Sequence, residues 1–269
     1  KPTESKTPAS GRGGYSVADA TKTRIDFTYK PQRIVSLGLS ADEVLLDMVE
    51  PERIAALTYL ADDAGISPAA AKAERVKGRV QSGSLESVLA QQPDLVLVPD
   101  WTDLNFVELL RGAKVPVYVY KTPYTVADVK KTIREVAFIV GEAERGEQVI
   151  KNFDDKIEAV QKKVSGIAGN TNRSVIAITG KGAFGAKGSI YDDMCKYARI
   201  KNCLQDLKTD DSTTISKEII IKENPDVIIV PSWDAPGMLK VQSMKEILND
   251  ESLQTVTAVK NKKVHQVPG

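Results

Sequence analysis

The sequence is poor in the side chains that usually hold metal ions. Its 269 residues include one histidine, His265, and two cysteines, Cys195 and Cys203. A bare transition-metal ion usually draws on several histidines, thiolates and carboxylates, and the Cys and His spacings of zinc sites are missing. We therefore expect no metal site and no resident cofactor. The cysteines are compatible with one local disulfide or two free thiols, and His265 with a structural or surface role.

Long apolar runs and excess charge of one sign are also missing. The longest apolar stretches, such as "VIAIT" and "LVLV", fall far short of the roughly 20 residues that span a bilayer, and no signal-peptide core is present. Lys and Arg total 37 against 36 Asp and Glu, which leaves a formal charge of +1. This balance gives no general attraction for nucleic acid or an anionic membrane.

The first fourteen residues, "KPTESKTPASGRGG", lack apolar periodicity and are rich in polar residues, proline and glycine. Such a composition predicts a flexible tether over residues 1–14. A mature exported lipoprotein would begin in this way, and a frayed terminus would have the same composition.

A segment of the first half recurs in the second half. "ESVLAQQPDLVLVPDW" begins at Glu86, and "EIIIKENPDVIIVPSW" begins at Glu218. The two glutamates are 132 positions apart, as are Trp101 and Trp233, and a serine precedes each copy at the same distance. The repeat indicates a duplicated architecture, which a chain of this length can fold as two domains.

Each copy of the repeat predicts a short helix followed by a buried strand. Ser84 and Ser216 are placed to cap the helix, and each glutamate falls in the first turn, where the helix dipole favours a carboxylate. "LVLV" and "VIIV" are continuous apolar runs without alternation, which is typical of a parallel strand covered on both faces. Prolines precede and end each strand.

The same pattern of strand, helix and strand occurs elsewhere, with predicted strands at "RIVSL" (33–37), "RIAAL" (53–57), "PVYVY" (116–120) and "SVIAIT" (174–179). We therefore predict an α/β protein with two Rossmann-like lobes and parallel central sheets. The N-terminal lobe is expected over residues 15–125, a connecting helix over 126–166 and the C-terminal lobe over 167–269. Helical periodicity from Val126 to about Val164, with a break at "GEAERG", predicts a nearly continuous strut of about 55 Å.

Two such lobes place a ligand cleft between them, because loops at the carboxyl ends of parallel strands form binding sites. Trp101 and Trp233 follow matched strands and are predicted to be cleft walls, although a single tryptophan there could equally pack on its lobe. The first-lobe loops carry three tyrosines that could stack on, hydrogen-bond or ligate a bound group: Tyr59, Tyr120 and Tyr124.

Several long stretches of the sequence carry a family resemblance. In the first half they are "YSVADATKTRIDFTYKPQRIVSLGLSADEVLLDM" and "GSLESVLAQQPDLVLV", and in the second half they are "ITGKGAFGAKGSIYDDM", "ISKEIIIKENPDVIIV" and "LQTVTAVKNKKVHQVPG". These stretches resemble the substrate-binding proteins of ABC importers for iron complexes and cobalamin, the helical-backbone class of periplasmic binding proteins. The resemblance covers nearly the whole chain from Tyr15. It implies two lobes and a helical connector. It also leads us to expect a further helix after the strand that ends near Val267, and this sequence departs from the family pattern there.

The resemblance also implies a location outside the cytoplasm, in the periplasm or on the cell surface as a lipoprotein, and binding without chemistry on the ligand. Contact with the membrane would then come only through a lipid anchor or the permease. In this family a glutamate at the start of one helix in each lobe meets basic residues of the permease, and Glu86 and Glu218 match those positions. We expect a monomer that docks through both glutamates.

A rival interpretation comes from Gly180-Lys-Gly-Ala-Phe-Gly185, which spells G-x-G-x-x-G after the strand "VIAIT" and suggests an NAD-dependent enzyme. The following helix is predicted to begin only at Ser189, so the last glycine would lie outside the first turn, where a pyrophosphate rests. We therefore favour a ligand loop, in which Lys181 and Lys187 could meet anionic groups and Phe184 could stack on a planar ligand.

The ligand classes that fit are bulky and partly apolar. We rank a ferric siderophore or other iron chelate first, cobalamin or a related corrinoid second and haem third. Aromatic walls with a few polar groups would serve all three, so the sequence hardly separates them.

Overall fold

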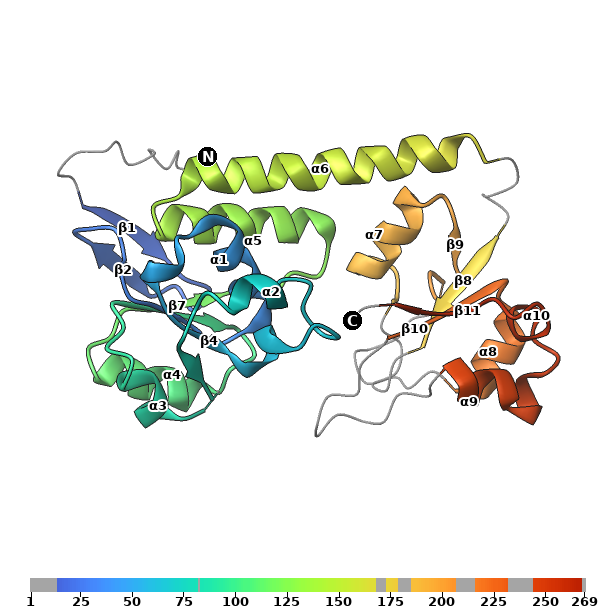
Figure 1. Ribbon diagram of the computed structural model, residues 1–269, viewed down its shortest axis with the longest axis horizontal. Coiled ribbons are helices and arrows are strands. Elements are labelled where there is room, and N and C mark those ends of the chain that lie inside the picture. The colour runs from blue at the N-terminus through green and yellow to red at the C-terminus, as the bar shows by residue number, and fades with distance from the viewer. Residues whose placement is uncertain are drawn as a thin grey trace. The chain divides into compact units, whose positions relative to one another are not determined.

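The computed structural model describes residues 14–81, 83–167, 173–178, 185–206, 216–231 and 244–267. The chain divides into two compact units. The first comprises Lys1–Pro123 and Ala127–Asn152, and the second comprises Tyr124–Val126 and Phe153–Gly269. Each unit has its own parallel sheet with helices packed on it, so the chain has the predicted two-lobed α/β fold (Figure 1).

The first unit is built on a five-stranded parallel sheet. In spatial order its strands are β5 (Arg79–Val80), β4 (Ile54–Thr58), β3 (Ile34–Ser36), β6 (Leu95–Pro99) and β7 (Val117–Tyr120). The chain moves outward from β3 to β5 on one side and then from β6 to β7 on the other. The direction of winding therefore reverses between β3 and β6, which is where open α/β sheets bind ligands.

Alternate residues of these strands enter two separate cores, one on each face of the sheet. Ile34, Leu95 and Leu97 pack with α1 (Leu39–Met48) and α5 (Val126–Ile139). On the other face, the neighbouring valines of β3 and β6 pack with α3 (Leu85–Leu89) and α4 (Leu104–Gly112). This double coverage explains why the strands are continuous apolar runs. Shorter helical segments complete the unit: η1 (Pro51–Arg53), η2 (Tyr59–Asp62) and α2 (Ala70–Ala73).

An antiparallel hairpin, which the sequence analysis did not predict, precedes this sheet. Its strands are β1 (Tyr15–Ala18) and β2 (Arg24–Phe27). The ring of Tyr15 stacks on Phe27 at 5.0 Å, and its hydroxyl donates to the Ile139 carbonyl oxygen at 2.5 Å. Tyr15 thus fastens the hairpin to the end of α5.

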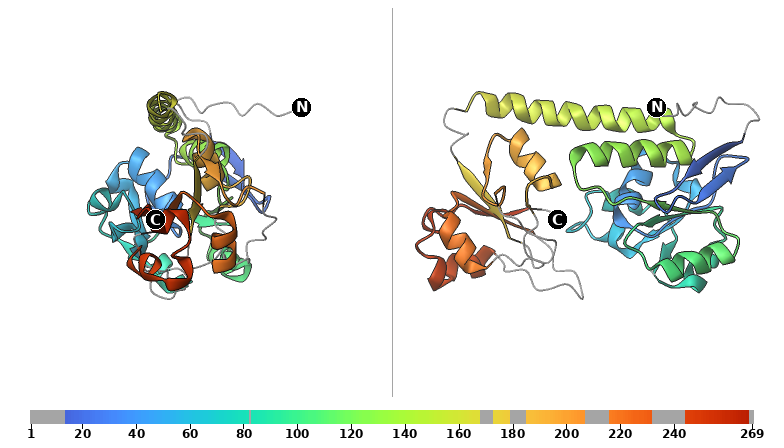
Figure 2. Two further views of the ribbon diagram at one scale, coloured as in Figure 1. Left: turned by 90° about the vertical axis from the view of Figure 1, so that its right-hand side faces the viewer. Right: turned by 180° about the vertical axis from the view of Figure 1, so that it is seen from behind.

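The prediction of one nearly continuous helical strut is wrong for the first half of that segment. The chain turns back after α5, and α6 (Ala143–Ser165) begins four residues later, so the two helices lie side by side and antiparallel (Figures 1 and 2). Gly141 adopts a φ of +71° in this turn. Gly146 permits close packing, because a Cβ there would lie 2.4 Å from that of Ala137. Helix α6, about 35 Å long at 1.5 Å per residue, begins in the first unit and continues into the second.

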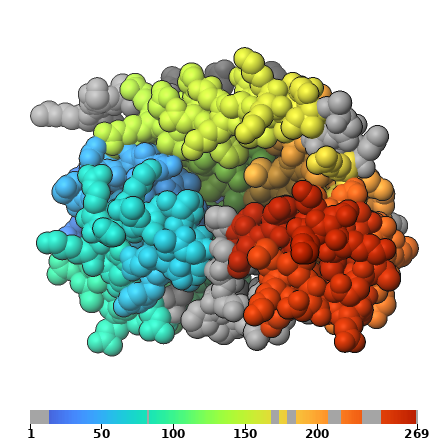
Figure 3. All heavy atoms as spheres, turned by 45° about the vertical axis from the view of Figure 1, so that its right-hand side comes forward, coloured from blue at the N-terminus to red at the C-terminus, as the bar shows by residue number. Residues whose placement is uncertain are grey.

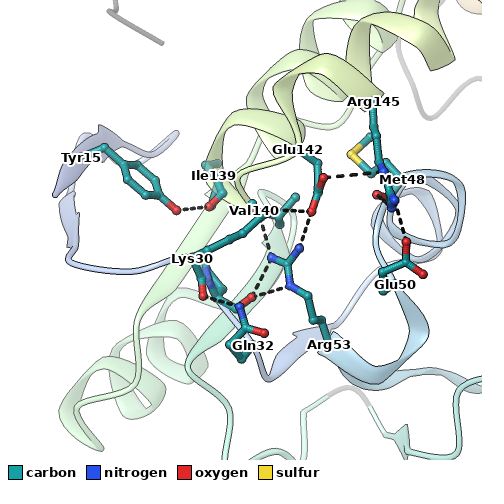
Figure 4. A network of polar contacts seen from close by, with 11 residues as sticks. Tyr15, Lys30, Gln32, Met48, Glu50, Arg53, Ile139, Val140, Glu142 and Arg145 are labelled. Carbon is teal, nitrogen blue, oxygen red and sulfur yellow. Dashed lines mark hydrogen bonds and ion pairs between the residues drawn. The ribbon is translucent and has the colours of Figure 1, made fainter. Parts of the chain in front are cut away.

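A polar network fixes the turn between α5 and α6 to the first unit (Figure 4). Arg53 donates to Glu142 at 2.5 Å, to the Val140 carbonyl oxygen at 2.6 Å and to the Pro31 carbonyl oxygen at 2.7 Å. Lys30 also pairs with Glu142, at 2.6 Å. The side chains of Arg53 and Glu142 are only 11% and 12% exposed, so this ion pair is largely shielded from water.

The second unit contains a four-stranded parallel sheet in the order β11 (Val264–Val267), β10 (Val227–Pro231), β8 (Ser174–Ala177) and β9 (Lys201–Asn202). Its helical segments are α7 (Ile190–Tyr197), α8 (Lys217–Glu223), α9 (Met244–Asn249), η4 (Glu251–Leu253) and α10 (Thr257–Lys260). Ile176, Ile228 and Val230 belong to its buried core. His265 lies exposed on the edge strand β11.

The later part of α6 has little of its surface buried. Most side chains from Lys151 to Ser165 are exposed, and the space-filling view shows them along the helix in yellow-green (Figure 3). Among the helices that the structure describes, none combines the length and the apolar character that crossing a membrane requires.

Candidate functional site

A hollow of about 400 Å³ lies at the carboxyl ends of the first unit's strands. Its volume falls within the roughly 300–1,000 Å³ of small-molecule sites. Every strand of the sheet contributes its last residue or one shortly beyond it, so the hollow surrounds the point where the winding reverses. The lining residues are Leu37, Gly38, Leu39, Ser40, Thr58, Tyr59, Leu60, Val80, Gln81, Trp101 and Tyr120.

Tyr120 is the most deeply buried aromatic residue of the hollow. It is 1% exposed, and its hydroxyl lies 3.0 Å from that of Ser40 in a hydrogen bond. Gly38 makes this position possible, because a Cβ there would lie 2.3 Å from the tyrosine oxygen. Burial raises the pKa of Tyr120 to about 12, so the phenol keeps its proton at neutral pH. It can therefore act as a hydrogen-bond donor, whereas the phenolate form is disfavoured.

Tyr59 and Trp101 provide aromatic surface that water can reach. They are 62% and 67% exposed, and Leu60 beside them is 42% exposed. Large side chains of this kind usually enter the core, so their exposure on residues that line a hollow indicates a surface for an apolar ligand. The first turn after β4 presents Tyr59, and the loop after β6 presents Trp101.

Two charged side chains beside the lining residues, those of Asp42 and Arg79, have their partners within the protein. Asp42, in the first turn of α1, is fully buried and accepts hydrogen bonds from the Thr58 amide and hydroxyl at 3.2 and 2.5 Å. Burial raises the pKa of Asp42 to about 7, despite these hydrogen bonds. Arg79, next to Val80, forms a bidentate pair with Asp62 at 2.8 and 2.5 Å.

The structure brings three of the predicted ligand residues, Tyr59, Trp101 and Tyr120, together in this hollow. Tyr124 is 61% exposed and is not among the lining residues. Lys187 is exposed in the turn before α7. The predictions for Lys181, Phe184 and Trp233 concern residues outside the described ranges.

Sequence reasoning missed most of the small and polar lining residues. Gly38, Ser40, Thr58 and Gln81 all lie just beyond or at the ends of strands. The rule that sites form at the carboxyl ends of parallel strands could have identified the first three, because the sequence predicted β3 and β4. Gln81 follows β5, a two-residue strand without a clear sequence signal.

The capping predictions for the repeated helices are confirmed. Ser84 accepts a hydrogen bond from the Ser87 amide at 3.2 Å, and Ser216 accepts one from the Ile219 amide at 3.4 Å. Glu86 and Glu218 lie in the first turns of α3 and α8 and are exposed. A hydrogen bond from Ser216 holds the pKa of Glu218 below its usual value, which keeps this carboxylate charged.

The start of α7 does not fit a pyrophosphate. The helix begins at Ile190 after the predicted cap Ser189, and the Asp192 carboxylate already accepts a hydrogen bond from the Gly188 amide at 3.0 Å. A second anion at this helix end would meet that negative charge. The geometry therefore disfavours the dinucleotide interpretation of the glycine loop.

The second unit holds both cysteines as free, buried thiols. Burial raises the pKa of Cys195 to about 11, so its reactive thiolate form is scarce at neutral pH. Across the described parts of the chain, no three His, Cys, Asp or Glu residues come together in a way that could hold a metal ion.

Comparison with known proteins gives consistent matches over most of the chain. The model of a family described as periplasmic binding protein matches residues 34–269. A cobalamin-binding protein of Halobacterium salinarum is 24% identical over 217 residues, which are 78% of this chain and 57% of that protein. The iron(3+)-hydroxamate-binding protein YxeB of Bacillus subtilis is 25% identical over 202 residues, covering 72% of this chain and 61% of YxeB.

Solved structures share the fold at low sequence identity. The heme-binding protein HmuT superposes with a TM-score of 0.73 and 17% identity, over 98% of this chain and 85% of HmuT. The chain spans less than two thirds of the length of the two curated relatives described above.

Proposed function

We propose, on the premise that this chain belongs to the periplasmic binding protein family, that it is an extracytoplasmic substrate-binding protein that captures a ferric chelate of the siderophore type. In this proposal it delivers the chelate to the permease of an ABC importer. The relatives that it matches bear the names of binding proteins, and the proposed function includes no chemical change of the ligand.

The observation that carries the proposal is the aromatic hollow at the winding reversal of the first unit. Tyr59, Trp101 and Tyr120 surround a space large enough for part of a bulky chelate, and Ser40, Thr58 and Gln81 add neutral hydrogen-bonding groups. A site of this composition holds a ligand by apolar contact and orients it with a few polar groups. The interlobe cleft expected from the sequence stays a prediction, and the proposal depends on this hollow alone.

Cobalamin is the second candidate ligand, supported by the similarity to the Halobacterium salinarum protein over 78% of this chain. Haem ranks third. Iron in haem can be held by a tyrosine phenolate, and burial opposes ionisation of Tyr120 by raising its pKa to about 12. Tyr59 remains available for stacking on any of the three ligands, because 62% of its surface is exposed.

We further propose that Glu86 and Glu218 are the contacts with the permease, one in each unit. Both are exposed carboxylates in the first turn of a capped helix, and both helices lead into a central strand, β6 or β10. The helix dipole alone would favour a carboxylate at such a position by roughly 0.3–1 kcal/mol. The recurrence of glutamate at both positions supports a common partner. The proposed protein acts as a monomer in the periplasm or as a cell-surface lipoprotein.

Tryptophan fluorescence tests the proposal directly, because Trp101 lines the hollow. The whole chain is titrated with a ferric hydroxamate, a ferric catecholate, cobalamin and hemin, with correction for ligand absorbance and with NAD as the negative control. We expect saturable quenching by a ferric chelate. Quenching by cobalamin or hemin alone would replace the proposed ligand, and quenching by NAD alone would contradict the binding-protein assignment.

A further inference from the structure

We infer that the hollow of the first unit receives an electrically neutral face of the ligand, so that the cargo is an uncharged metal chelate or corrinoid rather than a polyanionic one. The inference depends on the proposed function, because it names the ligand class of the same site.

The residues described as lining the hollow include none with a charged side chain. Their polar groups are the hydroxyls of Ser40, Thr58, Tyr59 and Tyr120, the amide of Gln81 and the indole N–H of Trp101. Such groups bind carbonyl oxygens, hydroxyls and amides well, but they do not neutralise a carboxylate or a catecholate. A polyanion placed here would lose its hydration without gaining a counter-charge.

Arg79 and Lys121 are the cations adjacent in the chain to lining residues, Val80 and Tyr120. Lys121 is exposed and does not line the hollow, and the hydrogen-bonding capacity of Arg79 is used up. A guanidinium has five N–H donors. Nε and Nη2 bind Asp62 at 2.8 and 2.5 Å, and Nη2 also binds the Ala73 carbonyl oxygen at 3.0 Å. Nη1 binds the carbonyl oxygens of Val76 and Gly78 at 2.8 and 2.7 Å. Recruiting Arg79 to an anionic ligand would break these bonds.

An exposed carboxylate beside the hollow would also disfavour an anion. Asp100 precedes Trp101, is exposed and accepts hydrogen bonds from the Thr122 amide and hydroxyl at 3.1 and 2.7 Å. Asp42 is buried directly behind Thr58, whose hydroxyl donates to it. With its hydrogen committed to Asp42, the Thr58 oxygen presents its lone pairs and can accept from an N–H or O–H of the ligand.

A neutral ferric trihydroxamate and a corrinoid with amide side chains share the chemistry that this hollow fits. Each presents apolar surface together with uncharged carbonyl or amide groups. The exposed faces of Tyr59 and Trp101 suit the apolar part, and the amide of Gln81 can both donate and accept. The titrations described next measure the ferric trihydroxamate and the corrinoid separately and so distinguish between them.

Calorimetric titration of the whole chain compares a neutral ferric trihydroxamate and cyanocobalamin with a trianionic ferric tris-catecholate and hemin. We expect one of the neutral ligands to bind at least about tenfold more tightly than either anionic ligand, and its Kd to change less than about twofold between about 0.02 and 0.5 M NaCl. Tighter binding of an anionic ligand would overturn the inference and leave the proposed function standing. Binding of none of the four would contradict the proposed function itself.

A matched pair of variants tests the hollow specifically. Leu60 lines it and Leu109, on α4, does not, although they are 42% and 57% exposed. Leu60→Lys adds a cation to the hollow and should raise the affinity for the tris-catecholate at least about tenfold. Leu109→Lys adds the same charge elsewhere on the unit and should leave every affinity within about twofold of wild type. Equal responses of the two variants would contradict the assignment of the neutral face to this hollow.

Discussion

Trp101 has a large apolar side chain that is mostly exposed, so its replacement should affect ligand binding more than the stability of the protein. It is 67% exposed, so Trp101→Ala should change the free energy of unfolding by less than about 0.5 kcal/mol. The loss of aromatic contact should weaken ligand binding at least about tenfold, measured by calorimetry. Leu109→Ala, which removes an exposed apolar side chain outside the hollow, should leave the affinity unchanged. If Trp101→Ala binds as wild type does, the hollow is not the ligand site.

Asp42 makes the stability of the first unit depend on pH. Its folded-state pKa is about 7, above the ordinary value of 3.8, because it is buried. Between these values the folded protein keeps a proton that the unfolded chain releases. The contribution of Asp42 is therefore fully present below about pH 4 and is lost as the pH rises to about 7, at about 1.4 kcal/mol per pH unit.

Asp42→Asn should remove this dependence. An amide keeps an oxygen that can accept from Thr58 but does not ionise, so the stability of the variant relative to wild type should increase between pH 4 and 7. Urea unfolding at several pH values measures the difference. Asp47→Asn, at an exposed position of the same helix, should leave the wild-type slope unchanged. Parallel stability curves for Asp42→Asn and wild type would show that Asp42 does not titrate in this range.

Among the structural elements, the buried strands were the most predictable. Continuous apolar runs identified β3, β4, β6, β7, β8 and β10, because strands with both faces covered carry no polar alternation. The hairpin of β1 and β2 was missed, since its exposed and buried residues alternate over only four positions in each strand. The turn after α5 was misinterpreted because the break at "GEAERG" was taken as an interruption of one nearly continuous helix. Only tertiary contacts, such as Gly146 against Ala137, show that the chain reverses there.

The network at the turn between α5 and α6 should contribute strongly to the stability of the first unit. Glu142→Gln would leave Arg53 largely buried without its counter-charge, at a cost of roughly 3 kcal/mol in the free energy of unfolding. Glu147→Gln, near the start of α6, provides the control, because its partner Arg134 and Glu147 itself are 52% and 58% exposed. Loss of that pair should cost less than about 1 kcal/mol.

Thermal and urea unfolding of the two variants measure this difference. Equal losses of stability in Glu142→Gln and Glu147→Gln would show that the buried network does not hold the turn. Retained stability in both would lead to the same conclusion.

At the scale of the whole molecule, the proposed docking to the permease needs one glutamate of the repeat from each unit. Glu86→Ala combined with Glu218→Ala should leave ligand affinity unchanged and abolish uptake by the cognate permease, since both exposed carboxylates are proposed to dock there. Uptake of labelled ligand in cells and calorimetry on the purified variant separate the two effects. Glu108→Ala with Glu251→Ala replaces one exposed glutamate in each unit and serves as the control. Unimpaired uptake by the first double variant would refute the docking role.

The candidate site was predictable in its position but not in its chemistry. Strand ends indicated Tyr59, Trp101 and Tyr120, whereas the neutrality of the hollow depends on contacts that join distant segments. Arg79 reads as a free cation in the sequence, and only the fold shows its five donors bound to Asp62 and to backbone carbonyls. Asp42 likewise reads as a surface residue of an amphipathic helix.

The hollow is formed by side chains at and just beyond the ends of five strands, while the residues that hold the sheet together lie further back along the same strands. Leu37, Val80 and Tyr120 belong to the cores, whereas substitutions at the exposed residues Tyr59, Leu60 and Trp101 leave both cores intact. In evolutionary terms, the ligand specificity can change independently of the fold. A few substitutions in the loops can give a lineage a new ligand without first destabilising the protein. Close sequence similarity is then a better guide to the cargo of such a protein than its fold.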